Sequence, residues 1–425
     1  MVLLDIEKPD AGINQAEIDR ELESALHALG DRKKVMAIPP DITRIHSFSG
    51  SITNSIYRIL GKSLTDILPA LGTHHAMGEK EIKTMFGNIP AGLFRVHNWR
   101  TDVVTVGELP GDFISEVSGN RVNYPWPAQL NRMIPEGGHD LILSIGQVVP
   151  HEVAGMAGYN KNILIGTGGP AAIHKSHFLG AVVGAENLMG RTDNPVRRVL
   201  NLASEKFTSS IPIVYILTVV GKDEKGRPVL KGLYAGDDIE CFQKAAAFSA
   251  KLNIELLEKP LAKVVVYLDP VEFHSTWLGN KSVYRSRMAI RDGGELLVIA
   301  PGVGKFGEDK TIDLLIRKYG YRTTEEILEL TGKNEDLQSN LSAAAHLIHG
   351  SSDGRFSITY CPGKLSREEV EGVHYNYENL ETAISRYAPG KLKEGYNKMQ
   401  DGEEIYYISN PALGLWSCRD RFEHD

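Results

Sequence analysis

Four polar segments of the chain carry residue types that can do acid-base, ionic or metal chemistry. Each follows closely on a short apolar run that is typical of a buried strand. The segments are Asp41-Ile-Thr-Arg44, Gly72-Thr-His-His75, Pro150-His151 through Lys161, and His174-Lys-Ser-His177. Ligands of open parallel sheets collect beyond the carboxyl ends of the strands. We therefore expect His74, His151 and His177 to meet at one site.

The spacing of these histidines matches no common zinc motif, since the chain has no HExxH sequence and no cysteine partner for them. His174 and His177 stand three residues apart, so both can face one site from a helix. A metal bound by these two histidines would have few protein ligands unless a cofactor supplied the rest. Gly155 and Gly158, after His151, allow the backbone to approach a ligand closely.

A second motif, Gly166-Thr-Gly-Gly-Pro170, follows the apolar run 162–165 and can be interpreted in two ways. With Ala171 at the third glycine position it resembles a dinucleotide fingerprint, but Glu186, about twenty residues on, does not close a clear strand. A tight turn beside the active centre is the favoured interpretation.

The apolar pattern predicts the elements that position these residues. Helical spacing indicates helices over 16–29, 51–60 and 237–257, and from residue 78 onward. Buried strands are expected at 34–38, 65–71, 141–145, 162–165, 211–220, 263–269, 294–301 and 404–408. Strands that alternate with helices predict an α/β fold with mainly parallel sheets and flanking helices. We expect two domains, residues 1–265 and 266–394, with the active site in the cleft between them; residues 395–425 could return to the first domain.

As a set, the DxTR, GTHxxM and P-H-x9-K motifs, with a histidine sixteen residues beyond that lysine, resemble the nickel-dependent lactate racemase family. The resemblance covers the first two hundred residues well and the rest more loosely. It implies a nickel pincer nucleotide, pyridinium-3-thioamide-5-thiocarboxylic acid mononucleotide, tethered to a lysine. Nickel is then held by a ring carbon, two cofactor sulfurs and one protein histidine.

The resemblance also implies roles for individual residues. Lys161 matches the tethering lysine, His177 the nickel ligand, and His74 and His151 the two acid/base histidines. Arg44 matches the partner of the substrate carboxylate, and Asp41 and Lys281 are expected to contact the cofactor. On the local pattern alone, Arg44 could instead pair with Asp41, and Lys161 could be a solvated loop residue. The implied reaction inverts Cα of a 2-hydroxy acid by hydride transfer, with proteins that make the cofactor as partners.

Three departures from the family pattern leave the substrate open among a short aliphatic or aromatic hydroxy acid, malate and a sugar acid. His75 replaces a common arginine, Tyr159-Asn160 stand where Gly-Arg is expected, and Trp277-Leu278 precede Lys281 in place of more polar residues. The roles of His75, His97 and His174 also stay open.

Composition limits the other classes of function. The formal charge of −7 gives no general attraction to nucleic acid or anionic membranes. Three scattered cysteines, no long apolar run and an acidic first segment favour a cytoplasmic protein. Two rivals to the racemase remain: an NAD-dependent 2-hydroxy acid dehydrogenase that uses the 166–170 turn, and a non-enzymatic nickel-binding protein that uses His174 and His177.

Overall fold

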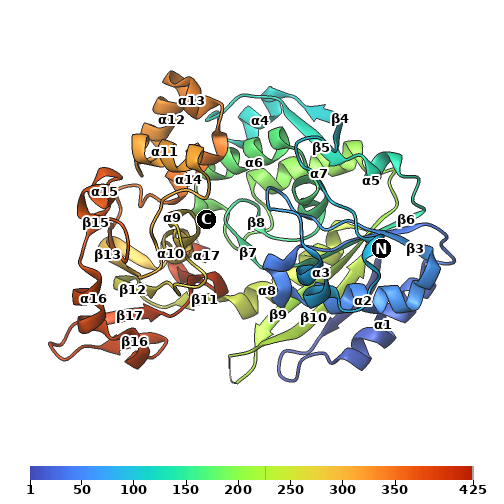
Figure 1. Ribbon diagram of the computed structural model, residues 1–425, viewed down its shortest axis with the longest axis horizontal. Coiled ribbons are helices and arrows are strands. Elements are labelled where there is room, and N and C mark those ends of the chain that lie inside the picture. The colour runs from blue at the N-terminus through green and yellow to red at the C-terminus, as the bar shows by residue number, and fades with distance from the viewer. Residues whose placement is uncertain (225, 424–425) are drawn as a thin grey trace. The chain divides into compact units, whose positions relative to one another are not determined.

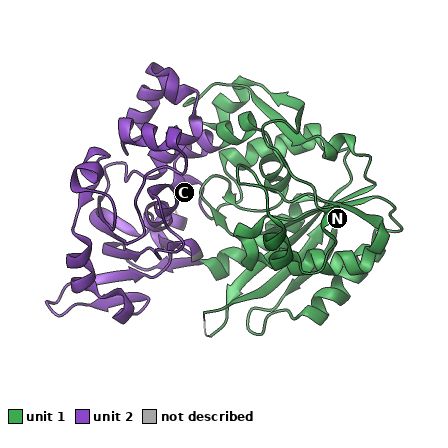
Figure 2. Ribbon diagram, viewed as in Figure 1, with its two compact units in different colours: residues 1–176, 190–253 green, residues 177–189, 254–425 purple. Residues whose placement is uncertain are grey.

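The computed structural model describes residues 1–224 and 226–423. The chain forms two compact units, one of residues 1–176 and 190–253 and one of residues 177–189 and 254–425 (Figure 2). The division after residue 253 lies ahead of the expected boundary at 265. Residues from 395 onward group with the second unit rather than with the first.

Unit 1 is built on a six-stranded sheet in the order β1-β10-β9-β6-β2-β3 (Figure 1). β9, β6, β2 and β3 run parallel to one another, whereas β10 pairs antiparallel with both β9 and β1. The strands are β1 (Val2–Glu7), β2 (Val35–Ile38), β3 (Leu64–Ile67), β6 (Leu141–Gln147), β9 (Ile213–Lys222) and β10 (Pro228–Gly236). Two small antiparallel ladders complete the unit, β4 (Val103–Leu109) with β5 (Trp126–Asn131) and β7 (Pro150–His151) with β8 (Gly155–Met156).

The helices of unit 1 bury one apolar face each against this sheet or its neighbours. In α1 the buried residues Ile18, Leu22, Ala25 and Leu26 follow helical spacing, and Asn14 and Glu17 form a capping box at its start. The helices are α1 (Gln15–Ala28), α2 (Ser49–Leu60), α3 (Glu79–Phe86), α4 (Gly111–Val117), α5 (Met133–Glu136), α7 (Pro195–Phe207) and α8 (Ile239–Asn253). Helix α6 (Pro170–Val183) starts in unit 1 and continues into unit 2.

Unit 2 has its own six-stranded sheet in the order β15-β14-β13-β12-β17-β16, parallel except for β16. Its strands are β12 (Leu261–Tyr267), β13 (Ile290–Ala300), β14 (Ser357–Pro362), β15 (Asn376–Tyr377), β16 (Gly395–Lys398) and β17 (Glu404–Ile408), with β11 (Ile254–Leu257) and β18 (Leu415–Cys418) forming a separate parallel pair. Its helices are α9 (Thr276–Gly279), α10 (Lys281–Ser286), α11 (Lys310–Tyr319), α12 (Thr324–Lys333), α13 (Glu335–Gln338), α14 (Leu341–His349), α15 (Arg367–Gly372), α16 (Leu380–Tyr387) and α17 (Arg419–Glu423).

The α/β fold with mainly parallel sheets is confirmed, and one predicted strand is wrong. Residues 162–165 lie in η4 (Asn162–Gly166), a π-helical turn, rather than in a strand. A short buried apolar run can form either a strand or a helical turn. Here the Asn162 side chain stabilises the helical turn, because its amide donates to the Ile38 carbonyl (3.0 Å) and the Ser144 hydroxyl (3.1 Å). Helix α8 also ends at Asn253 rather than at 257, and the expected loop after Asp41 is the 3-10 helix η1 (Ile42–Ser47). No helix in the described ranges is long and apolar enough to cross a membrane.

Candidate active site

The carboxyl ends of three adjacent parallel strands of unit 1 carry most of the predicted site residues. Asp41 follows β2, His74 follows β3, and His151 and Lys161 follow β6. Because β6, β2 and β3 are neighbours in the sheet, their ends open at the same edge. Two backbone links hold the segments there: a parallel bridge joins Pro40 to Ala70, and the Gly72 amide donates to the Gly166 carbonyl (2.8 Å).

Asp41 and His74 form a direct pair across two of these loops. The His74 Nδ1 lies 2.6 Å from the Asp41 Oδ2, and the Thr43 amide and hydroxyl both donate to the other carboxylate oxygen. Burial opposes charge on Asp41, but the bonds from His74 and Thr43 outweigh it and lower the pKa of this carboxyl. The Asp41 side chain is 5% exposed, whereas the His74 side chain is 52% exposed. The His74 imidazole thus faces solvent, and the buried, ionised Asp41 carboxylate holds it in place.

His151 is held by its own hairpin. His151 pairs with Gly155 across the β7–β8 ladder, and Gly155 takes the positive φ (73°) that the tight turn of this hairpin requires. The backbone amides of Val153 and Ala154 donate to the His151 Nδ1, at 3.0 and 3.4 Å. The side chain is 12% exposed, and its ring orientation is therefore fixed by the main chain.

Lys161 directly precedes η4, and two positions before it lies a residue with a strained backbone. Tyr159 has φ 57°, in the left-handed region where the expected glycine would be favoured, and its ring is held by stacking on Phe242. Burial, and then repulsion from Arg44, lower the pKa of the Lys161 amine to about 8. The nearby Glu152 opposes this shift and Arg197 adds to it. Arg44 therefore lies near Lys161, and its guanidinium is exposed.

Arg197, on α7, fixes the segment before Lys161. Its guanidinium is 1% exposed, donates to the Asn160 Oδ1 and the Met156 carbonyl (both 2.6 Å), and lies over the Phe242 ring. All of these partners are neutral, and burial lowers the pKa of Arg197 to about 10. A buried cation so placed disfavours a second positive charge on Lys161.

The 166–170 turn is packed by protein rather than shaped for a phosphate. The Gln129 Oε1 accepts from the Ala171 and Ala172 amides, at 3.1 and 3.3 Å, at the start of α6. These amides are the donors that a dinucleotide phosphate would need. A side chain on Gly169 would meet the same Gln129 oxygen at 2.6 Å. The buried His97 contacts the Gly168 carbonyl (3.1 Å) and the Asn131 amide (3.0 Å), so it braces this turn.

His174 and His177 both lie on α6, as the spacing predicted, but the two belong to different units. His174 is in unit 1, where its ring lies 6.0 Å from the Trp99 ring; burial and repulsion from Arg100 lower its pKa. His177 and Lys281 belong to unit 2, Lys281 as the first residue of α10. The groups that the structure brings together are thus Asp41 with His74, and Arg44 with Lys161.

Trp277, close to Lys281 in the sequence, is one of the departures from the family pattern. Trp277 stacks on His346 with ring centroids 4.3 Å apart. Burial, with a smaller contribution from His349, lowers the pKa of His346 to about 3, so this ring is neutral. Trp277 is accordingly fixed by packing within unit 2.

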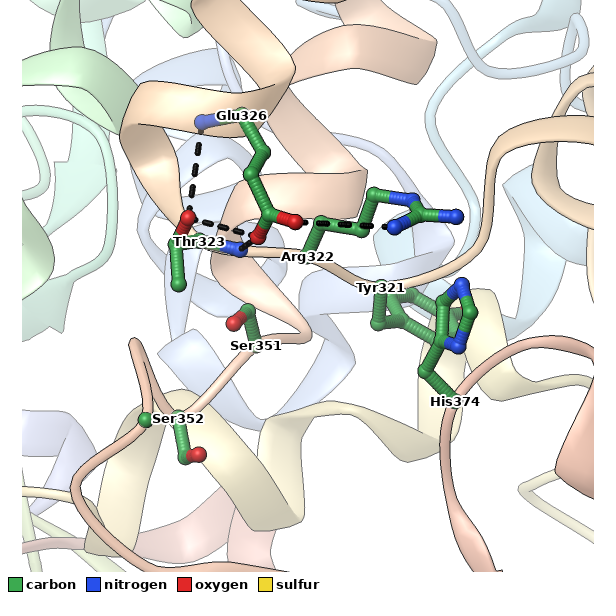
Figure 3. Close-up of a pocket in the computed structure, with 8 residues that line it drawn as sticks. Tyr321, Arg322, Thr323, Glu326, Ser351, Ser352 and His374 are labelled. Carbon is green, nitrogen blue, oxygen red and sulfur yellow. Dashed lines mark hydrogen bonds and ion pairs between the residues drawn. The ribbon is translucent and has the colours of Figure 1, made fainter.

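A cavity of ≈ 260 Å³ in unit 2 contains none of the predicted site residues (Figure 3). Its polar groups already serve the start of α12: the Thr323 hydroxyl donates to the Glu326 carboxylate (2.7 Å), and Arg322 lies 3.5 Å from the same carboxylate. Figure 3 shows these three side chains turned toward one another.

Sequence reasoning missed Glu152, Arg197, Gln129 and Asn162. Glu152 could have been found, because it directly follows His151. The other three act through partners more than thirty positions away or through the backbone, and no local motif marks them.

Residues 15–190 match the family model for the lactate racemase N-terminal domain. The match identifies this stretch as a lactate racemase N-terminal domain. It contains Asp41, His74, His151, Lys161 and His177, whereas Lys281 lies outside it. The predicted family resemblance is thereby confirmed.

Two solved structures share the fold over nearly the whole chain. A protein from Thermotoga maritima is 24% identical, with a TM-score of 0.80, over 97% of this chain and 100% of that one. The lactate racemase apoprotein from Thermoanaerobacterium thermosaccharolyticum is 17% identical, with a TM-score of 0.68, over 96% of this chain and 90% of that one. At these identities the likeness establishes the fold alone. No curated protein matches the sequence significantly.

Proposed function

We propose that this protein inverts the Cα configuration of a small 2-hydroxy acid. The observation that carries the proposal is the gathering of the Asp41–His74 pair, His151 and Lys161 beyond three adjacent strands of the domain that matches the lactate racemase model. The family relation supports isomerase chemistry, and the residues on these loops are the kinds that such chemistry needs.

The residues of this chain would bind and orient the substrate as follows. Arg44 offers an exposed guanidinium that can hold a carboxylate through two parallel hydrogen bonds. That bond fixes one end of the substrate, so that the planar 2-oxo state can turn about it. His74 and His151 present imidazoles to the oxygen on C2, and imidazole is the side chain best suited to handle a hydroxyl proton near neutral pH.

Lys161 and His177 are the residues that would hold a nickel pincer nucleotide. An amide-like link needs a neutral amine, and the lowered pKa of Lys161 fits this need. No group of three His, Cys, Asp or Glu in the described part of the chain is arranged to hold a metal. A metal here fits a site in which an organic group supplies most ligands and His177 supplies one. When bound, such a group supplies hydride acceptance and return at Cα.

The NAD-dependent dehydrogenase is the weaker candidate. The α6 amides at its required phosphate position already bond to Gln129. Visible absorbance separates the two candidates, since a nickel pincer adduct has visible bands and free NAD has none. Turnover of any 2-hydroxy acid by cofactor-loaded protein would exclude a non-enzymatic nickel-binding protein.

The test is a screen for inversion. The protein is co-expressed with the cofactor-making proteins, and pure enantiomers of lactate, aromatic hydroxy acids, malate and sugar acids are followed by chiral chromatography. We expect one class to be inverted, with His27→Ala as an active control, because His27 lies exposed on α1. Failure to invert any of them by protein whose Lys161 is shown to be modified would overturn the proposal.

A further inference from the structure

We propose that Arg197 is the positioning residue of Lys161. Its guanidinium joins the two ends of the turn 156–160, and these two bonds fix the place of the Lys161 amine in the site. The inference rests on the proposed function, in which Lys161 holds the cofactor. It assigns a role to a residue of α7 that lies outside every motif of the sequence.

The turn that leads into Lys161 has a strained backbone. Two consecutive residues take a positive φ, Gly158 (87°) and Tyr159 (57°). Glycine adopts this conformation at little cost, whereas a bulky residue such as tyrosine does not. A strained conformation persists only where surrounding contacts hold it. Lys161 is the second residue after Tyr159, so relaxation of this turn would displace it.

Arg197 bonds to both ends of the strained turn. One guanidinium nitrogen donates to the Asn160 Oδ1 and the other to the Met156 carbonyl (both 2.6 Å). Because the guanidinium is planar and rigid, it holds these two acceptors at a set separation. The Asn160 amide in turn donates to the Oδ1 of Asn201, also on α7 (2.8 Å). The residue directly before Lys161 is thus fixed by α7 through both polar atoms of its side chain.

The start of α7 is itself tied to the same segment. The Asn194 Oδ1 accepts from the Arg197 amide (2.9 Å), and the Asn194 amide donates to the Ala154 carbonyl in the β7–β8 hairpin (3.2 Å). The Phe242 ring stacks on Tyr159, and the Arg197 guanidinium lies 4.4 Å from the centroid of that ring. Arg197 is therefore held in place from its main chain to its guanidinium.

The burial of Arg197 is costly for folding. The side chain is 1% exposed, its hydrogen-bond acceptors are neutral, and its Nε has no hydrogen-bond partner within the described part of the chain. Burying a charge beside neutral partners and leaving a donor unmatched both destabilise a protein. Local costs of this kind are expected at functional sites. The predicted site residue that follows the contacts of Arg197 is Lys161.

Positioning by Arg197 can be separated from its charge. The charged groups that act on the Lys161 amine are Arg44 and Arg197, which disfavour its protonation, and Glu152, which favours it. Lysine at position 197 keeps a positive charge but lacks the planar pair of donors that spans both acceptors. Arg197→Lys therefore removes the positioning and retains the charge, whereas Arg197→Met removes both.

The first arm of the test is the pH profile of Lys161 acetylation in apoprotein by the N-hydroxysuccinimide ester of acetic acid, followed by peptide mass spectrometry. We expect a wild-type midpoint near 8. In Arg197→Lys and Arg197→Met the midpoint should move toward the ordinary lysine value of about 10.4. Arg198→Met is the matched control, because Arg198 is the next residue of α7, is exposed and pairs with Asp193. It should keep the wild-type midpoint.

An unchanged midpoint in Arg197→Lys overturns the inference, because the charge alone would then suffice. Asn160→Ala covers the case in which the Arg197 variants do not fold. It removes one of the two acceptors and leaves Arg197 and α7 in place, so it should shift the midpoint in the same direction. A wild-type midpoint in folded Asn160→Ala likewise overturns the inference.

The second arm is the fraction of chains that carry the added mass of the cofactor on Lys161 after co-expression with the cofactor-making proteins. Arg197→Lys should be loaded about tenfold less than wild type, because a misplaced nucleophile reacts more slowly. Arg198→Met should be loaded like wild type. Equal loading of Arg197→Lys and wild type overturns the inference. If wild-type protein is loaded but inverts nothing, the proposed function fails, and the loading and acetylation of the variants still decide the role of Arg197.

Discussion

The lowered pKa of Lys161 distinguishes this amine from that of an ordinary surface lysine. With a pKa of about 8, about one amine in ten is neutral at pH 7, against fewer than about one in a thousand for a lysine at about 10.4. Acylation of Lys161 by a small reagent, followed by peptide mass spectrometry, should rise with pH through a midpoint near 8 and level off about one unit above it.

Arg44→Gln provides the control for this pH profile. Because the Arg44 charge helps to lower the Lys161 pKa, its removal should move the midpoint to higher pH. A wild-type profile that still climbs steeply through pH 10 would contradict the lowered pKa.

His177 and His174 are separable by metal content. In cofactor-loaded protein we expect His177→Ala to lose most of its nickel, measured per chain by plasma mass spectrometry. His174→Ala should keep most of it, because the His174 ring packs beside the Trp99 ring within unit 1. The reverse pattern would assign the ligand to His174.

At the scale of elements, the π-helical turn η4 depends on one side chain. Asn162 reaches the Ile38 carbonyl, the Ser144 hydroxyl and the Ile145 carbonyl at 3.0–3.3 Å. Asn162→Ala should leave these groups unsatisfied and cost about 1–3 kcal/mol in the free energy of unfolding. Urea denaturation measures this loss, with Gln338→Ala on the exposed end of α13 as control. A loss no larger than that of the control would show that η4 does not need the bond.

Elements with strong periodicity could be predicted, and those decided by distant partners could not. The spacing in α1 and the apolar run of β2 depend only on their own residues, and both prediction and structure agree there within one residue. The polar residues after β2, β3 and β6 could likewise be placed at one sheet edge. The run 162–165 looks the same as a buried strand, because what makes it helical is the contact of Asn162 with β2 and β6. The Asp41–His74 bond and the Gln129 cap also join segments that no local pattern connects.

At the scale of the whole molecule, the chain crosses between its units at residues 177–189. Ala185 and Met189 pack in one apolar cluster with Tyr284, Met288 and Leu415. Within the same unit Glu186 accepts from Arg287 (2.6 Å) and Arg355 (3.0 Å). Sequence periodicity cannot reveal such an excursion, because it depends on packing against residues about a hundred positions away.

The crossing segment predicts a stability effect at Glu186. Arg287 is buried, and among the described residues loss of the carboxylate would leave its charge with only the more distant Asp353 (3.5 Å) as anionic partner. Glu186→Gln should cost about 1–3 kcal/mol in the free energy of unfolding. Glu240→Gln, which removes an exposed pair with Lys244, should cost less than about 0.5 kcal/mol. Equal melting curves for the two variants would contradict the structural role of this segment.

In the proposed reaction a 2-hydroxy acid is inverted by transfer of hydride, and the side chains move only the hydroxyl proton. The most direct measurement uses an enantiomerically pure substrate with deuterium at Cα, turned over by cofactor-loaded protein in ordinary water. Mass spectrometry of the inverted product should find the deuterium still at Cα, because a hydride held within the site does not exchange with solvent. Inverted product that has lost the deuterium to water would show that a base removes the Cα proton, and would contradict the account.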